Sequence, residues 1–191
     1  MTENTENTVD EKKEKIKQMF WMVKTASGHT KMELRRAAST PNRMTLSQQI
    51  IYQQLMEGWS EKEKELYKEF FLKMFAFYVK QDCKRGMPFE NFLYKRYRSS
   101  DAQNSEKKKI EMIIDQQNTI LFLRAITGYI QTYKGDTAID FEKLTLDCYK
   151  WTKYMKMNKR SYVRDNWIRV IAGTKSSEYA ASKDDDEDTE D

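Results

Sequence analysis

Apolar residues recur every three or four positions along most of the chain, and this spacing predicts helices. The first predicted helix is capped by Asp10, runs to about residue 25 and is ended by Gly28. A short helix capped by Thr30 follows, and residues 37–43 form a connector. The next helix begins at Thr45 or Ser47 and ends before residue 58.

Two long helices are predicted in the middle of the chain. Ser60 and Glu63 form a capping box that opens a helix to about residue 85, where Gly86 ends it in the C′ position. Pro88 then begins a short helix. A second long helix is predicted from about residue 105 to 134, and Gly128 within it indicates close helix packing, because glycine costs ~1 kcal/mol against alanine there.

The last two predicted helices are separated by a break near residues 158–161. Asp140 caps the first of them, and Ser161 caps the second, which ends near residue 171. Trp151 shares an apolar stripe with Leu144 and is predicted to lie in the core, as is Trp167.

The pattern predicts an all-α fold, an irregular bundle of six to eight helices with no strand. Only two prolines and six glycines occur, too few for the many turns of a sandwich or barrel. With 191 residues, we expect one basic helical domain over residues 10–173. Residues 1–9 and 174–191 are expected to be disordered acidic tails.

Charge is distributed very unevenly along the chain. Residues 11–177 hold 33 Lys/Arg against 19 Asp/Glu, a net charge of about +14, whereas residues 178–191 hold eight acids and one lysine. A strongly basic body attracts polyanions, which are nucleic acid, an anionic membrane surface or an acidic protein.

The sequence offers little catalytic chemistry. His29 is the only histidine and has no metal-ligating neighbour at the required spacing, and no glycine-rich phosphate loop occurs. Cys83 and Cys148 are isolated and are predicted to be buried, reduced thiols. No signal peptide or bilayer-spanning apolar run is found, so we expect an intracellular protein, cytoplasmic or nuclear, with no metal, cofactor or enzymatic activity.

Basic side chains cluster with or beside aromatic ones in four parts of the chain, at residues 31–43, 80–85, 94–98 and 150–169. Lysine and arginine bind phosphate, and exposed bases stack on tyrosine rings at ~1–3 kcal/mol each. The tyrosines at 94, 97, 154 and 162 are the stacking candidates. The candidate nucleic-acid-binding residues are Lys80, Lys84, Arg85, Tyr94, Lys95, Arg96, Tyr97, Arg98, Lys150, Lys153, Tyr154, Lys156, Lys159, Arg160, Tyr162 and Arg164.

Two basic runs contribute no residue to this list of candidates. One comprises Lys31, Arg35, Arg36 and Arg43, and the other is Lys107–Lys109, which lacks aromatic residues. Three lysines near a helix N-terminus oppose the helix dipole, so an external anion would relieve their repulsion.

The acidic residues 184–191 resemble a nucleic-acid backbone in charge density. One hypothesis is that this tail folds back on the basic body and competes with weak polyanions, and others are that it recruits a basic partner or only solubilises the chain. Ser39 and Ser182 lie in short motifs typical of phosphorylation sites, and a phosphate at Ser182 would deepen the negative block.

The sequence therefore favours a non-enzymatic, nucleoprotein-like or packaging-like protein that binds RNA or single-stranded DNA. Binding would use phosphate contacts and stacking with little sequence preference, and the acidic tail would modulate it. Self-association is compatible with such a role. An adaptor or matrix-like module, whose basic face meets an acidic partner or a membrane surface, is the alternative. A carboxylate-based, magnesium-dependent nuclease is the third.

Overall fold

The structure, a computed structural model, describes residues 3–99, 104–132, 137–157 and 161–173. The predicted all-α fold is confirmed: these residues form nine α-helices and no strand, with one isolated bridge between Met87 and Ile139. None of the described helices is both long enough and apolar enough to cross a bilayer.

The first half of the chain forms four helices and one short 3-10 turn. They are α1 (Glu3–Thr25), α2 (Gly28–Ser39), the 3-10 turn η1 (Pro41–Arg43), α3 (Leu46–Leu55) and α4 (Glu61–Lys80). The second half forms five helices. They are α5 (Phe89–Arg98), α6 (Asn104–Asp115), α7 (Thr119–Thr132), α8 (Phe141–Lys156) and α9 (Tyr162–Ile171).

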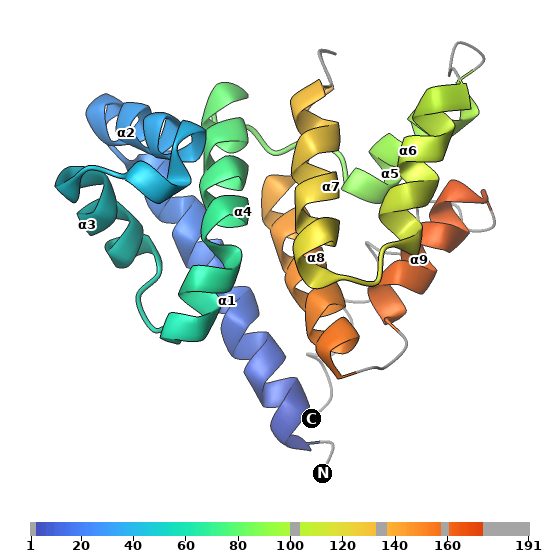
Figure 1. Ribbon diagram of the computed structural model, residues 1–191, viewed down its shortest axis with the longest axis horizontal. Coiled ribbons are helices and arrows are strands. Elements are labelled where there is room, and N and C mark those ends of the chain that lie inside the picture. The colour runs from blue at the N-terminus through green and yellow to red at the C-terminus, as the bar shows by residue number, and fades with distance from the viewer. Residues whose placement is uncertain (1–2, 100–103, 133–136, 158–160, 174–191) are drawn as a thin grey trace, which may run out of the picture.

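The helices form two groups that meet along α4, α7 and α8. In Figure 1, α1–α4 occupy the left half, α5, α6 and α9 gather on the right, and α7 and α8 lie between them. Helix α4 packs against α2, α7 and α8, and α1 packs against α8, so one core runs through both groups.

Aromatic rings fill much of this core, as the sequence predicted for Trp151 and Trp167. Both side chains are buried, and their ring centroids lie 5.2 Å apart in an edge-to-face arrangement. Phe122 of α7 lies 4.3 Å from Trp151, and Phe89 of α5 lies 5.4 Å from Trp167. These contacts fix α5 and α9 against α7 and α8.

Most helix starts follow the predicted capping residues. The hydroxyls of Ser60 and Ser161 and the carboxylate of Asp140 accept backbone N–H groups at the starts of α4, α9 and α8, and Thr45 caps α3. Helix α1 begins at Glu3, before the Asp10 cap that was predicted.

The cap of α2 was predicted wrongly. Its hydroxyl comes from Ser27, whose oxygen accepts the Thr30 N–H, and Gly28 is the first residue of the helix instead of a stop for the preceding one. Helix α2 also extends to Ser39, so the predicted connector is reduced to the turn η1.

The long helix predicted over residues 105–134 is two helices. Asn118 interrupts it, because its side-chain oxygen accepts the N–H groups of Ile120 (3.0 Å) and Leu121 (3.1 Å) and so caps α7. The prediction of close packing at Gly128 is wrong as well, since this residue is exposed and a Cβ there would meet nothing within 4 Å.

The predicted end of α4 at Gly86 is also wrong. The helix ends at Lys80, and Asp82 and Cys83 both adopt positive φ, at 58° and 54°. Gly86 instead lies against the backbone of Ala138, where a Cβ would stand 2.1 Å from the carbonyl carbon. Glycine is therefore required here by close backbone approach.

Candidate nucleic-acid interface

The α5–α6 basic surface is made of Tyr94, Lys95, Tyr97 and Arg98 on α5 and Lys107, Lys108 and Lys109 on α6. The described residues 94–99 and 104–109 include six Lys/Arg and one acid, Glu106. Side chains that are exposed include Lys95, Arg98, Lys108 and Lys109. Tyr94 keeps 38% of its surface exposed. Positive charge and an accessible ring therefore occur together here.

Arg96 joins helices α5 and α6. Its guanidinium donates two hydrogen bonds to the Glu106 carboxylate, at 2.7 and 2.6 Å. Tyr129 of α7 donates to the same carboxylate at 3.1 Å. The hydrogen bond from Arg96 holds the pKa of Glu106 below its usual range, despite partial burial. Among the predicted residues, Arg96 is thus a structural cross-link.

Tyr97 is held in place at the seam between α5 and α6. Its hydroxyl donates to Glu111 at 2.9 Å, and this hydrogen bond raises the pKa of the phenol. The Lys107 ammonium lies 5.7 Å from the ring centroid, within cation–π range. The ring is thus fixed beside the first lysine of the run 107–109.

Helix dipoles affect the two halves of this surface in opposite ways. Lys95 and Arg98 lie in the last turn of α5, where positive charge is favoured. Lys107, Lys108 and Lys109 lie near the start of α6, where the dipole disfavours positive charge. An anion bound over α6 would offset this repulsion.

The predicted residues on α8 are placed elsewhere. Lys150, Lys153 and Tyr154 are half-buried and Lys156 is exposed. Burial lowers the pKa of both Lys153 and Lys156. The nearby positive charge of Lys12 lowers the pKa of Lys153 as well. Lys153 and Lys156 lie near the start of α4, close to Glu63, and form a second basic group.

Lys12 of α1 completes this second group, and the sequence did not suggest it. Its ammonium lies 2.8 Å from Glu63 and 4.0 Å from the centroid of the Trp59 ring. Lys156 lies 5.6 Å from the Tyr67 ring centroid. No sequence signal could reveal the group, because Lys12 is more than 140 residues from Lys153.

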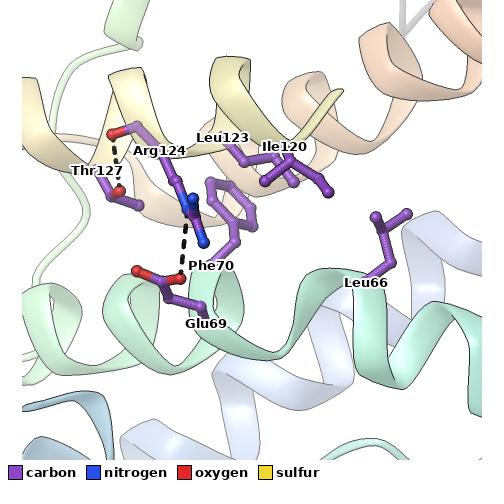
Figure 2. A pocket seen from close by; sticks show the side chains of 7 residues that line it. All are labelled: Leu66, Glu69, Phe70, Ile120, Leu123, Arg124 and Thr127. Carbon is purple, nitrogen blue, oxygen red and sulfur yellow. Dashed lines mark hydrogen bonds and ion pairs between the residues drawn. The ribbon is translucent and has the colours of Figure 1, made fainter. Parts of the chain in front are cut away.

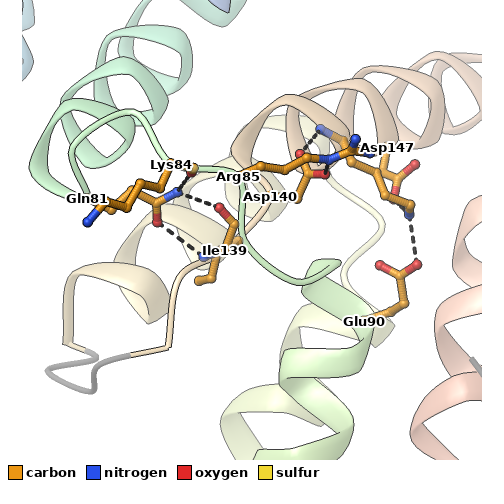
Figure 3. A network of polar contacts seen from close by, with 8 residues as sticks. Gln81, Lys84, Arg85, Glu90, Ile139, Asp140 and Asp147 are labelled. Atoms are coloured by element: carbon orange, nitrogen blue, oxygen red, sulfur yellow. Dashed lines mark hydrogen bonds and ion pairs between the residues drawn. The ribbon is translucent and has the colours of Figure 1, made fainter. Parts of the chain in front are cut away.

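The predicted residues near the end of α4 form a third group. Lys80 and Lys84 are exposed, and Lys84 lies 3.7 Å from Asp82. Arg85 donates to the buried carboxylate of Asp140 at 3.0 Å, as Figure 3 shows. Arg85 therefore also links the end of this loop to the start of α8.

The two predicted residues on α9 differ in exposure. Tyr162 keeps 67% of its surface exposed. Arg164 donates to the Ile114 carbonyl at 2.8 Å and to the Asp115 carboxylate at 3.2 Å, which ties α9 to the end of α6. Lys159 and Arg160 lie outside the described residues.

Of the two predicted phosphorylation sites, Ser39 lies among the described residues. Ser39 is exposed at the end of α2, where its hydroxyl donates to the Arg35 carbonyl at 3.3 Å. Ser182, like the rest of the segment 174–191, lies outside the described residues.

A buried ion cluster fixes the start of α5 against α8. The Lys143 ammonium lies 2.7 Å from carboxylate oxygens of both Glu90 and Asp147. Trp167 of α9 donates its indole N–H to Asp147 at 3.4 Å. Burial raises the pKa of Asp147, while attraction to the two carboxylates outweighs burial and raises the pKa of Lys143. Figure 3 shows Glu90 reaching from α5 towards this cluster.

Two cavities between the described helices are small. One, between α4 and α7, has a volume of about 30 Å³ and is crossed by an ion pair of 3.7 Å between Arg124 and Glu69 (Figure 2). The other, about 230 Å³, lies between α1 and α3 over Met19 and Leu55. Both volumes are below the ~300–1,000 Å³ of typical small-molecule sites. Within the described residues, no three His, Cys, Asp or Glu side chains are grouped so that they could hold a metal ion.

Among the predicted residues, α5 thus brings together Tyr94, Lys95, Arg96, Tyr97 and Arg98, and α6 adds its lysine run beside them. No protein-family model matches the chain, and comparison with curated proteins and with solved structures finds no significant match either.

Proposed function

We propose that this chain is a non-enzymatic protein that binds single-stranded nucleic acid through the α5–α6 basic surface. The observation that carries the proposal is the combination of an accessible Tyr94 ring with Lys95, Arg98 and the run Lys107–Lys109 on two adjoining helices. Ammonium and guanidinium groups would neutralise phosphates, and the ring would stack on a base.

This chemistry favours binding with little sequence preference. Phosphate contacts position a protein on nucleic acid without reading the bases, and stacking tolerates every base because each has a π face. Single strands are favoured over duplexes, because their bases are free to stack on exposed rings. A nucleoprotein-like or packaging-like role, in RNA or single-stranded DNA, would use such affinity.

The acidic segment 184–191 would modulate this binding. Seven of its eight residues are Asp or Glu, so it offers the surface a charge density like that of the nucleic acid itself. The segment would displace polyanions that bind this surface weakly, whereas polyanions that bind it tightly would stay bound. Neutralising the segment should therefore strengthen nucleic-acid binding.

The test is a binding titration with a labelled 30-mer single strand and its duplex. The informative variant is Lys108→Glu with Lys109→Glu, and the matched control is Lys24→Glu with Lys62→Glu, which makes the same change in net charge at exposed sites on α1 and α4. We expect the first variant to lose at least tenfold in affinity for the single strand and the control to lose much less. At moderate salt, a charge that contacts the strand affects the affinity more than a distant, screened charge does.

Other outcomes would identify the alternatives. Equal losses in both variants would mean that only net charge matters and would refute a site on α5 and α6. Binding to anionic vesicles without binding to the 30-mer would instead support the matrix-like module. Cleavage of the strand that stops with a metal chelator would support the nuclease.

A further inference from the structure

The chain leaves the described body directly beside the α5–α6 basic surface. The Arg98 guanidinium donates to the carbonyl of Ala172 at 2.8 Å, just after α9. At Gly173, which has φ of 75°, a Cβ would lie 3.2 Å from the Arg98 guanidinium and 3.6 Å from the Tyr94 ring. Two members of the surface therefore contact the point at which residues 174–191 begin.

The segment that begins there is complementary in charge to this surface. Residues 174–191 contain eight acids and two lysines, and seven of those acids lie in residues 184–191. The α5–α6 basic surface, whose Arg98 lies beside Gly173, also carries Lys95 and the three lysines at 107–109. Opposite charges at this density attract each other strongly at low ionic strength.

The length of the segment suits this contact. Ten residues separate Gly173 from Asp184, and ten residues span at most about 35 Å. Arg98 contacts Ala172, and Arg96, two residues away on α5, binds Glu106 next to Lys107, so the first lysine of α6 lies within that reach. A tether of this length gives a local concentration in the millimolar range.

We propose that residues 184–191 dock on the α5–α6 basic surface and occupy the phosphate sites of the nucleic acid. The competition with nucleic acid rests on the proposed function, whereas the docking itself requires no nucleic acid. The contact of Arg98 with Ala172 directs the segment to this surface, and the lysines at 153 and 156 on α8 are the competing location.

Docking can be measured directly in the full chain by paramagnetic relaxation. A nitroxide is attached at Ser182→Cys. The native thiols compete poorly for the label, because Cys83 and Cys148 are buried and burial raises the pKa of both. We expect amide signals at residues 94–98 and 107–109 to be broadened at 50 mM salt and to recover at 500 mM.

Two variants make the measurement specific. Lys108→Glu with Lys109→Glu should abolish the broadening, and Lys24→Glu with Lys62→Glu should leave it unchanged. Broadening centred on Lys153 and Lys156, or none beyond that of a chain whose acids at 184–191 are replaced by amides, would overturn the proposal.

The consequence for binding is measured separately. The chain with amides at 184–191 should bind the 30-mer about three- to tenfold more tightly than the parent chain at low salt. Broadening without any binding to the 30-mer would refute the proposed function and leave docking in place. Binding to the 30-mer without broadening would refute docking and leave the proposed function in place.

Discussion

The same substitution should have opposite effects at two glycines. Gly86→Ala places a Cβ 2.1 Å from the Ala138 carbonyl carbon and 2.3 Å from the Ile139 nitrogen, and both are backbone atoms that cannot rotate away. Gly128→Ala places its Cβ in open space on the exposed side of α7. Gly86→Ala should therefore destabilise the protein, and Gly128→Ala should stabilise it.

The magnitude at Gly86 follows from the contacts that must separate. The Met87 N–H donates to the Ala138 carbonyl at 3.0 Å, and the Asp140 N–H donates to the Met87 carbonyl at 2.8 Å. Gln81 adds two more hydrogen bonds to the Ile139 backbone, at 2.7 and 3.1 Å. At ~0.5–1.5 kcal/mol each, losing two or three of these bonds costs about 1–4.5 kcal/mol. Alanine in place of Gly128 gains about 0.5–1 kcal/mol, because it restricts the unfolded chain and favours the helix.

The assay is urea unfolding of the full chain and both variants, followed by circular dichroism. For a slope of about 2 kcal/mol per molar urea, the midpoint of Gly86→Ala should fall by about 0.5–2 M and that of Gly128→Ala should rise by up to about 0.5 M. A Gly86→Ala protein as stable as the parent would show that the close approach of residues 86 and 138 is not present in solution. A loss above 1 kcal/mol at Gly128 would contradict the open space around it.

Three further predictions concern the buried ions, the stacking ring and the cap of α7. Lys143→Met should cost about 3–5 kcal/mol at pH 7, because Glu90 and Asp147 remain as buried like charges. Lys143 lowers the pKa of Asp147 against the effect of burial, so removing Lys143 raises that pKa further and the native variant binds a proton more readily than the native parent. The loss measured by urea unfolding should therefore shrink as pH falls from 7 towards 5, and a loss independent of pH would contradict this. Tyr94→Ala should weaken binding of the single strand about 5- to 150-fold, while Tyr94→Phe keeps the ring and should bind like the parent; equal losses would exclude stacking. Asn118→Ala should cost about 0.5–2 kcal/mol in urea unfolding, and no change would refute its role as a cap.

Features that depend on a few neighbouring residues could be predicted from the sequence. The capping box of Ser60 and Glu63 is complete within four residues, and it forms as predicted. The burial of Trp151 follows from an apolar stripe on its own helix. Asn118 shows the limit of such local patterns. The spacing of apolar residues continues from α6 into α7 and predicts a single helix, so it hides the cap that Asn118 forms between them.

Features that depend on residues distant in sequence could not be predicted. Gly86 resembles a helix stop, and only the fold brings Ala138 against it. The same holds for the candidate site, because a sequence shows which side chains are basic but not which of them form ion pairs with distant carboxylates. Arg85 finds its carboxylate 55 residues away at Asp140, and Lys12 finds Glu63 51 residues away.

Salt dependence of binding tests the proposed nucleic-acid interface most directly. The α5–α6 basic surface carries five Lys/Arg besides Arg96, and each phosphate neutralised on a single strand contributes about −0.7 to the slope of log K against log salt. For the full chain and a 30-mer single strand, we therefore predict a slope of about −3.5, or roughly a 100-fold loss of affinity between 50 and 200 mM salt. Lys108→Glu with Lys109→Glu should reduce this slope to about −2. No binding at low salt, or a slope near zero, would contradict the account.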